Sequence, residues 1–340
     1  MSAERERMTR RRFMGEGMKA AAGAAAGMAA LAAPRARAAE PPAADTSRIL
    51  NYNPRMEYRR LGKTNLMVSA VGLGGHSRSN EKERTEIVSR CIDAGINYID
   101  ACTRGEVCRD AKALQGRRDR MYLALSHCAN EVRNEDFRTA PKLLESLDAV
   151  LKDSGQDHTD LWRITCFEPG GRHTFDTACE IVAALEQAKR QGKARFIGFS
   201  SHDRRWIKFM IEYFPQVQVV CFPFATMSKA APADSLFEAL KKCDVGAFGI
   251  KPFGAGSLFT GDADQDNRRA RLAIRYVLRT NTVIPIPGMN SVGDVDNVAT
   301  AVAERRELDA GEQADLRRAA DRMWAGLPPR YQWLRDWEYV

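Results

Sequence analysis

DLWRITCFEPGGRHTFDTACEIVAALEQAKRQGKARFIGFS, residues 160–200, contains the repeating unit from which we predict the fold. Its two ends, 160–165 and 194–199, are short apolar runs of strand length. Between them the apolar residues recur at helical spacing, at Ile181, Ala184, Leu185 and Ala188. A strand, a helix and a second strand in this order are typical of parallel strands joined by a crossover helix.

The same alternation occurs about eight times after residue 56. The other expected strands lie near 69–74, 96–100, 121–125, 217–222, 246–250 and 283–287. Eight such units predict an α/β fold, a closed (β/α)8 TIM barrel. An open doubly wound sheet is the alternative, but it needs a GxGxxG turn after its first strand. Gly72-Leu73-Gly74-Gly75 lacks that form.

We predict four segments along the chain of 340 residues. They are a signal peptide at 1–38, a Pro-containing linker at 39–55, the barrel at 56–303 and a helical, aromatic-rich extension at 304–340. The extension holds Trp324, Trp333 and Trp337, so it should pack as a cap, a lid or a subunit contact rather than stay solvated.

The first 38 residues have the organisation of an export signal. Thr9-Arg10-Arg11-Arg12-Phe13-Met14 precedes a weakly hydrophobic Ala/Gly tract, and Ala36-Arg37-Ala38 offers a small-x-small cleavage site. The pattern resembles a twin-arginine signal, which implies the twin-arginine translocase as a transient partner and a periplasmic location. The alternative is a cytoplasmic protein with a basic tail. The tract is too short for a good membrane span.

Charge argues against nucleic acid as a partner. The formal net charge is +8, but the first 38 residues alone carry seven Arg and one Lys against three Glu. The remainder has no basic stripe interleaved with aromatic residues. We therefore expect a small-molecule substrate and no nucleic acid.

Eight cysteines occur without a CxxC pair or a zinc or iron–sulfur spacing, so no metal is indicated by motif. Four lie in apolar stretches and are expected to be small core residues: Cys91, Cys179, Cys221 and Cys243. The sequence leaves open whether the other four, Cys102, Cys108, Cys128 and Cys166, form disulfides or bind metal.

Several motifs point to one family. The run from Met56 through Leu61-Gly62-Lys63-Thr64 to Ser69, followed by Gly72-Leu73-Gly74, resembles the opening of bacterial aldo-keto reductases, in which a small hairpin closes the barrel bottom. Gly95-Ile96-Asn97-Tyr98-Ile99-Asp100 resembles the second strand of that family, which ends in its active-site aspartate. The similarity covers about residues 56–303.

The resemblance implies that NADP or NAD binds across the barrel mouth. Ser200, Ser201 and Gln218 match the contacts to the nicotinamide carboxamide. The other matching positions form a pyrophosphate loop and an adenosine segment: Lys251, Phe253, Gly254, Gly256 and Leu258, then Gly288, Ser291, Asp296 and Asn297. Residues 290–293 lack the Arg or Lys that commonly pairs with the 2′-phosphate, so NADP need not be preferred.

The catalytic groups that the resemblance implies are largely replaced. The family uses Asp, Tyr, Lys and His; Asp100 is present, but Gly105, Ser126 and Thr165 stand at the other three positions. We expect Arg104 to be the cation nearest Asp100 and His127 to supply acid–base chemistry. Catalysis is therefore assigned to Asp100, Arg104 and His127, without a metal.

Three functions remain open at this stage. The first is an oxidoreductase that binds NAD(P)(H) and acts on an unidentified carbonyl or alcohol with non-standard acid–base residues. The second is a non-catalytic nucleotide- or ligand-binding barrel. The third is a thiol- or metal-dependent periplasmic enzyme on the same scaffold, with Cys102, Cys128 and Cys166 near its centre.

Overall fold

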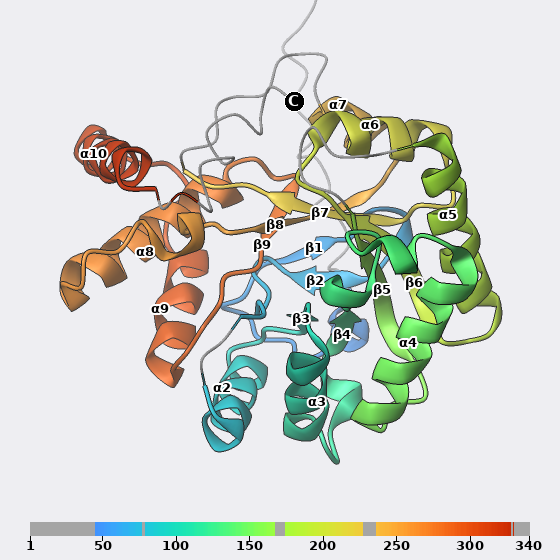
Figure 1. Ribbon diagram of the computed structural model, residues 1–340. Helices are drawn as coiled ribbons and strands as arrows, with labels where there is room; N and C mark the ends of the chain where they lie inside the picture. Colours follow the sequence, from blue (N-terminus) through green and yellow to red (C-terminus); the bar gives the residue numbers. More distant parts are fainter. Residues whose placement is uncertain (1–44, 77–78, 167–173, 227–235, 328, 330–340) are drawn as a thin grey trace, which may run out of the picture. The chain divides into compact units, whose positions relative to one another are not determined.

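Seven parallel strands curl around a common axis and follow one another in chain order (Figure 1). The computed structural model describes residues 45–76, 79–166, 174–226, 236–327 and 329, all within the unit Asp45–Val340. The strands are β3 (Tyr98–Ala101), β4 (Tyr122–Leu125), β5 (Thr159–Thr165), β6 (Ala194–Ser200), β7 (Val219–Pro223), β8 (Gly246–Ile250) and β9 (Val283–Pro285). Each predicted strand from 96–100 onward is confirmed to within a few residues.

Residues 72–74 close the sheet into a barrel. The amide of Leu73 donates to the carbonyl of Tyr98 on β3 at 2.9 Å, and the amide of Gly72 donates to Pro285 on β9 at 3.0 Å. Because this short segment is bonded to the first and the last strand, it takes the place of the eighth strand. The predicted (β/α)8 barrel is confirmed, and the doubly wound sheet is excluded.

A hairpin plugs the bottom of the barrel. β1 (Tyr58–Arg60) pairs with β2 (Met67–Ser69) in antiparallel fashion, as expected for the opening segment. Leu61 and Val68 enter the barrel interior and join Tyr98, Cys221 and Phe248 in one buried cluster. The rings of Tyr98 and Phe248 stack with centroids 4.0 Å apart. The lower interior is thus filled with side chains, and only the opposite end is free for chemistry.

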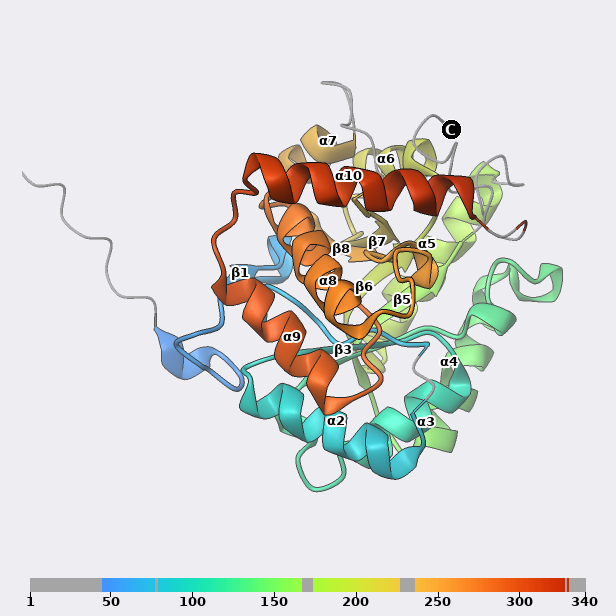
Figure 2. The same ribbon diagram turned by 90° about the vertical axis from the view of Figure 1, so that its left-hand side faces the viewer.

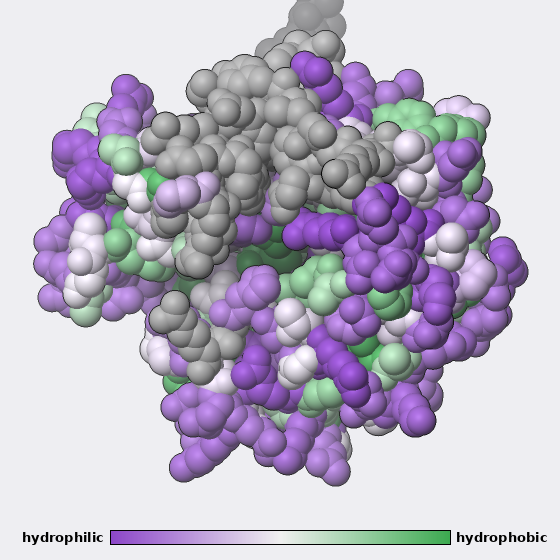
Figure 3. Space-filling view, in the orientation of Figure 1, coloured by the Kyte–Doolittle hydropathy of each residue, from purple (hydrophilic) through white to green (hydrophobic). Residues whose placement is uncertain are grey.

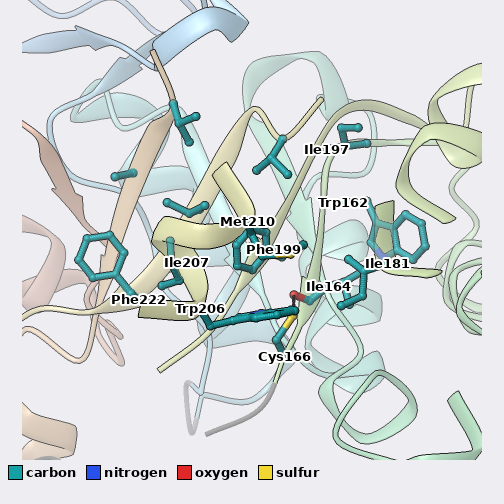
Figure 4. Close-up of a cluster of buried hydrophobic side chains, with 14 of the residues drawn as sticks. Trp162, Ile164, Cys166, Ile181, Ile197, Phe199, Trp206, Ile207, Met210 and Phe222 are labelled. Carbon is teal, nitrogen blue, oxygen red and sulfur yellow. Dashed lines mark hydrogen bonds between the residues drawn. The ribbon is translucent and has the colours of Figure 1, made fainter. Parts of the chain in front are cut away.

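Helices surround the sheet. They are α2 (Glu81–Asp93), α3 (Arg104–Ala113), α4 (Ala140–Ser154), α5 (Phe175–Arg190), α6 (Arg204–Tyr213), α7 (Leu236–Lys242), α8 (Ala263–Leu278) and α9 (Val292–Ala303), followed by α10 (Ala310–Ala325). Figure 4 shows how they pack: Trp162 and Phe199 leave the outer face of the sheet and meet Ile181, Ile207 and Met210. The prediction that Cys179 is a core residue is wrong, because it lies exposed on α5.

α10 lies across α8 on the side of the barrel (Figure 2). Leu316 packs with Leu272 and Leu308, and Met323 joins the main core on the other side. The signal peptide, the first part of the linker (39–44) and the aromatic residues after 330 lie outside the described residues. Whether the extension acts as a lid stays a prediction. None of the helices described is long and apolar enough to cross a membrane.

Gly198 on β6 offers a test of the barrel's packing. A Cβ at this position would approach the backbone carbonyl of Val219 on β7 to 2.1 Å. We therefore expect Gly198→Ala to lower the free energy of unfolding by about 1–3 kcal/mol, as overpacked cores do. In α3, a Cβ at Gly105 meets nothing within 4 Å, so Gly105→Ala is the matched control and should be neutral or slightly stabilising. Urea unfolding measures both; equal effects would contradict this packing.

Candidate functional site

A buried ion pair lies at the centre of the barrel. Arg163 on β5 binds Asp100 on β3 through two hydrogen bonds, from Nη2 to Oδ1 at 2.6 Å and from Nε to Oδ2 at 3.1 Å. Both side chains are about 4% exposed. The hydroxyl of Tyr98 donates to Oδ2 of the same carboxylate at 3.1 Å. Asp100 is thus a paired, hydrogen-bonded anion in a closed interior.

The strand pattern explains how Arg163 reaches Asp100. Leu161, Arg163 and Thr165 alternate along β5, so successive members of this set share one face of the strand. On the intervening strand the residue level with Asp100 is Ala124, whose small side chain leaves room for the guanidinium. Although burial opposes the charged form, the negative charge of Asp100 raises the pKa of Arg163. The guanidinium of Arg163 therefore remains a cation beside the carboxylate.

Arg104 and His127 do not join this pair. Arg104 forms an ion pair with Asp153 of α4 at 2.5 Å, and its side chain is 57% exposed. The Nδ1 atom of His127 lies 3.2 Å from the hydroxyl of Ser146, also on α4. Burial and the positive charge of Arg104 lower the pKa of His127. The prediction that Arg104 is the cation beside Asp100 is wrong, because the side chain of Arg104, like that of His127, contacts α4 instead.

Ser126 and Thr165 line the mouth above the ion pair. Their hydroxyl oxygens are 3.1 Å apart at the ends of β4 and β5. The fully buried carboxylate of Glu131 accepts the amide of Thr165 at 2.7 Å and that of His127 at 2.9 Å. Burial raises the pKa of Glu131. Glu131 therefore ties the two loops together, a role that the sequence did not indicate.

Thiols, an imidazole and a second buried carboxylate meet on the β3 side of the mouth. The Sγ atom of Cys102 lies 3.0 Å from Nε2 of His76 and 3.5 Å from Oε2 of Glu106. The thiol of Cys128 donates to the carbonyl of Cys102 at 2.8 Å. A hydrogen bond between the two thiols lowers the pKa of Cys128 to about 7 and raises that of Cys102.

The cysteine predictions divide accordingly. Cys102 and Cys128 do meet at the mouth, whereas Cys166 is buried in the outer layer beside Trp206 (Figure 4). Burial raises the pKa of Cys166 to about 12. All eight cysteines lie in the described residues and are unpaired, so the possible Cys102–Cys108 disulfide is not formed. The expectation of three thiols at the centre of the site is wrong for Cys166.

The opposite side of the mouth is formed by β6, β7 and β8. Ser200 and Ser201 are buried at the end of β6, and Ser200 lies level with Cys221. Gln218 precedes β7 and accepts hydrogen bonds from Lys189 and from the amide of Ile197, near the other end of the strand. Its assignment to the nicotinamide carboxamide is therefore wrong, because the strand register places Cys221 beside Ser200.

The loop after β8 is partly covered by the C-terminal helix. The Nζ atom of Lys251 lies 3.4 Å from Nε2 of buried His202. Gly254 has φ +55°, and a Cβ there would lie 2.3 Å from the sulfur of Met323 on α10. Phe253 is half-buried and Leu258 fully buried. Gly254 thus meets α10, whereas a Cβ at Gly256 would enter open space.

The predicted adenosine segment is largely engaged with the protein itself. Ser291 caps α9, and the carboxylate of Asp294 accepts the amides of Asn290 and Ser291 at 2.8 and 3.2 Å. Asp296 is ion-paired with Arg90 of α2 at 2.6 Å. Asn297 accepts from Arg271 of α8 at 2.7 Å. Asp296 and Asn297 bridge neighbouring helices, so their assignment as nucleotide contacts is not supported by their side-chain positions.

Gly288 and the surface around the mouth complete the site. Gly288 follows β9 and pairs with Gly74 in an isolated bridge, so it helps to close the barrel. In the orientation of Figure 1, apolar surface lies at the centre of the exposed face and mostly hydrophilic residues surround it (Figure 3). The mouth thus combines an apolar floor with the polar groups described above, as small-molecule sites do.

Comparison with known proteins identifies the family. The model of the aldo/keto reductase family matches residues 70–271. The chain belongs to the aldo/keto reductase family. L-Galactose dehydrogenase of Arabidopsis thaliana is 24% identical over 297 residues, which is 76% of this chain and 92% of that protein. L-Glyceraldehyde 3-phosphate reductase of Escherichia coli K12 is 24% identical over 272 residues, 72% of this chain and 76% of that protein.

A solved structure with the same fold is also available for comparison. The holo form of aldo-keto reductase AKR11C1 from Bacillus halodurans superposes with a TM-score of 0.62 at 20% identity, covering 82% of this chain and 99% of that one. At this identity the superposition supports the fold and leaves the chemistry of the mouth to be argued from its own residues.

The Asp100–Arg163 pair can be tested by removing one charge at a time. Arg163→Met leaves Asp100 buried without its cation, so we expect it to cost about 3–5 kcal/mol of unfolding free energy. Adding Asp100→Asn should recover part of that loss, because the stranded charge disappears. Arg104→Met is the control: it breaks an exposed pair and should cost less than about 1 kcal/mol. Urea unfolding of these three variants and of Asp100→Asn alone measures the coupling; similar losses for Arg163→Met and Arg104→Met would contradict it.

Proposed function

We propose that this member of the family is an oxidoreductase that binds NAD(P)(H) at the barrel mouth and acts on a small carbonyl or alcohol with non-standard acid–base residues. The observation that carries the proposal is the buried Asp100–Arg163 pair, which fixes two opposite charges in the barrel interior below Ser126 and Thr165. Family membership and a holo-form structural relative support nucleotide binding. Two relatives, L-galactose dehydrogenase and L-glyceraldehyde 3-phosphate reductase, favour a polyhydroxylated substrate.

The residues at the mouth fit the nicotinamide and pyrophosphate parts of a nicotinamide dinucleotide better than its adenosine part. Ser200 and Ser201 are buried at the end of β6, so they can hold the carboxamide, and Lys251 with Gly256 can face the pyrophosphate. The nucleotide would supply or accept hydride. At the adenosine end, the amides of Asn290 and Ser291 are taken by Asp294. We therefore propose that binding is modest and that NADP is not preferred over NAD.

The proposed loss of the usual proton donor shapes the chemistry. Gly105, Ser126 and Thr165 stand where the family has Tyr, Lys and His, and serine or threonine hydroxyls are poor acids near neutral pH. Tyr98 is no substitute, because its hydroxyl is 1% exposed within the barrel and already donates to Asp100. What remains is a cation below the mouth, Arg163, which is bound to Asp100 and about 4% exposed, so it can stabilise developing negative charge electrostatically without transferring a proton.

A second candidate function has a specific observation in its favour. His76, Cys102 and Glu106 bring an imidazole, a thiol and a carboxylate together at one edge of the mouth. This arrangement favours a thiol- or metal-dependent enzyme over a purely ligand-binding barrel. The two candidates are separable, since the nucleotide contacts and these three residues come from different strands.

We also propose that residues 1–38 direct export through the twin-arginine translocase to the periplasm. The support is the Arg10-Arg11 pair in its Thr-Arg-Arg-x-Phe-Met context. Because that route carries folded proteins, a nucleotide loaded in the cytoplasm could cross with the barrel. Replacing Arg10 and Arg11 by Lys should retain the precursor in the cytoplasm on cell fractionation; unchanged export would disprove the signal.

Titration calorimetry with NADH and NADPH tests nucleotide binding directly. We expect both to bind with affinities within about threefold of each other. Ser200→Ala should weaken binding roughly 2- to 10-fold, the effect of one neutral hydrogen bond. Ser154→Ala, on α4 and bonded only to its own helix, is the matched control. Absence of heat with both nucleotides, in protein shown to be folded, would remove the proposal.

The missing proton donor predicts poor turnover of ordinary aldehydes. Positioned acids typically contribute about 100- to 10,000-fold, so NADPH oxidation with a panel of aldehydes should stay below about 1 per second. Arg163→Met should abolish any residual rate, whereas Arg104→Met should not. Turnover of about 10 per second or more on simple aldehydes would show that an effective proton donor is present.

A further inference from the structure

We propose that His76, Cys102 and Glu106 form a binding site for a divalent transition metal of the zinc class. The site lies at the barrel mouth, just after residues 72–74 and after β3. The inference goes beyond the proposed oxidoreductase function and does not depend on it.

The three donor groups are close enough to share one metal ion, because one ligand atom from each lies within 4.8 Å of the others. The sulfur of Cys102 lies 3.0 Å from Nε2 of His76 and 3.5 Å from Oε2 of Glu106, and Nδ1 of His76 is 3.4 Å from Oε1 of Glu106. Zinc bonds of about 2.3 Å to sulfur and about 2.0–2.1 Å to nitrogen or oxygen place tetrahedral ligands roughly 3.3–3.6 Å apart. The 3.0 Å distance involves Nε2 of His76 and the 3.4 Å distance involves Nδ1, so the exposed ring has to shift to present one nitrogen to the ion.

The three ligand types also select the metal. Thiolate and imidazole bind zinc and its neighbours in the first transition row more strongly than they bind magnesium or calcium. A carboxylate adds a negative charge that helps to neutralise the ion. One thiolate, one imidazole and one carboxylate therefore favour Zn²⁺ or Co²⁺ over hard cations.

Glu106 is held in place before any metal arrives. It lies in the first turn of α3, which Thr103 caps, and it is 6% exposed. Its carboxylate accepts the amide of His76 at 2.6 Å and the amide of Cys102 at 3.0 Å. One carboxylate thus fixes the backbone of both other ligands. Such second interactions orient metal ligands and reduce the cost of ordering them.

The charge of Glu106 is incompletely neutralised by the protein. Within the described ranges no Lys or Arg forms an ion pair with it, and its ionisable partners are His76 and the thiol of Cys102. The nearby Arg84 is paired with Asp110 instead, at 2.5 Å. A buried carboxylate held by amides, a thiol and an imidazole, without a Lys or Arg partner, favours a cation beside it. A divalent ion would supply that charge and would displace the proton of Cys102 to solvent.

One coordination position is left for an exogenous ligand. The side chain of His76 is 74% exposed, so the site opens to solvent on that side. We do not assign Cys128 as a ligand, because its thiol donates to the carbonyl of Cys102. Three protein ligands with an open position are typical of catalytic rather than structural zinc sites. Such an ion would be bound two residues after Asp100 in the chain, at the end of β3.

Metal binding can be measured without any assay of activity. Full-length protein is stripped with EDTA, and Co²⁺ is then added while absorption is recorded. We expect one Co²⁺ per chain, with a thiolate-to-cobalt charge-transfer band and the intense visible bands of tetrahedral cobalt. Zn²⁺ should bleach both by displacement. Calorimetry with Zn²⁺ gives the affinity.

Variants assign the ligands. Cys102→Ser should abolish the charge-transfer band, and His76→Ala or Glu106→Gln should each weaken Zn²⁺ binding by about 100-fold or more, more than the roughly 10- to 100-fold typical of outer-shell changes. His76→Ala is the safest of these for folding because its ring is exposed. Cys179→Ser and His158→Ala are matched controls at an exposed thiol and at an imidazole paired with Asp157.

Three results would overturn the site. They are the absence of Zn²⁺ binding below millimolar concentration, a charge-transfer band that survives in Cys102→Ser, and a Cys102–Cys128 disulfide found by mass spectrometry of protein isolated without reductant. Nucleotide binding is read by a separate titration with NADH, so failure of the metal site and failure of the oxidoreductase proposal give different results.

Discussion

Two opposite charges buried in the middle of the barrel constrain everything above them. Neither Asp100 nor Arg163 is stable alone in a closed interior, so each depends on the bidentate geometry that the other provides. That geometry in turn depends on the strand register, on a small residue at position 124 and on the hydroxyl of Tyr98. Below the pair the barrel is packed with apolar side chains. Above the pair lie the polar groups of the mouth.

The mouth consequently has two chemically different halves. On the side of β3 and β4, sulfur, imidazole and carboxylate groups gather around Cys102. On the side of β6 to β8 lie the buried Ser200 and Ser201 and, beside His202, Lys251. A hydride carrier on the second side and an oxygen-polarising centre on the first would be separated by the guanidinium of Arg163. The family's scaffold can accommodate both because each half is built by different loops.

Much of this arrangement follows from the sequence, and its failures have definite causes. Strand positions and the family were predictable because apolar periodicity and the opening hairpin are local signals. Arg163 was missed although its alternation with Leu161 and Thr165 already placed it inside the barrel. Gln218 was misassigned because motif matching ignores register, and three residues along a strand span about 10 Å. Asp296 and Asn297 were misplaced because helix-to-helix contacts such as that with Arg90 leave no mark in one sequence.

The contact between Gly254 and Met323 links two distant parts of the chain. The loop after β8 can keep its left-handed turn and its close approach to α10 only while one residue has no side chain and the other has a slender, flexible one. A larger residue at either position would require a smaller one at the other. Over evolutionary time the two positions should therefore change together, and the helix beyond the barrel would be inherited with the loop as a single unit.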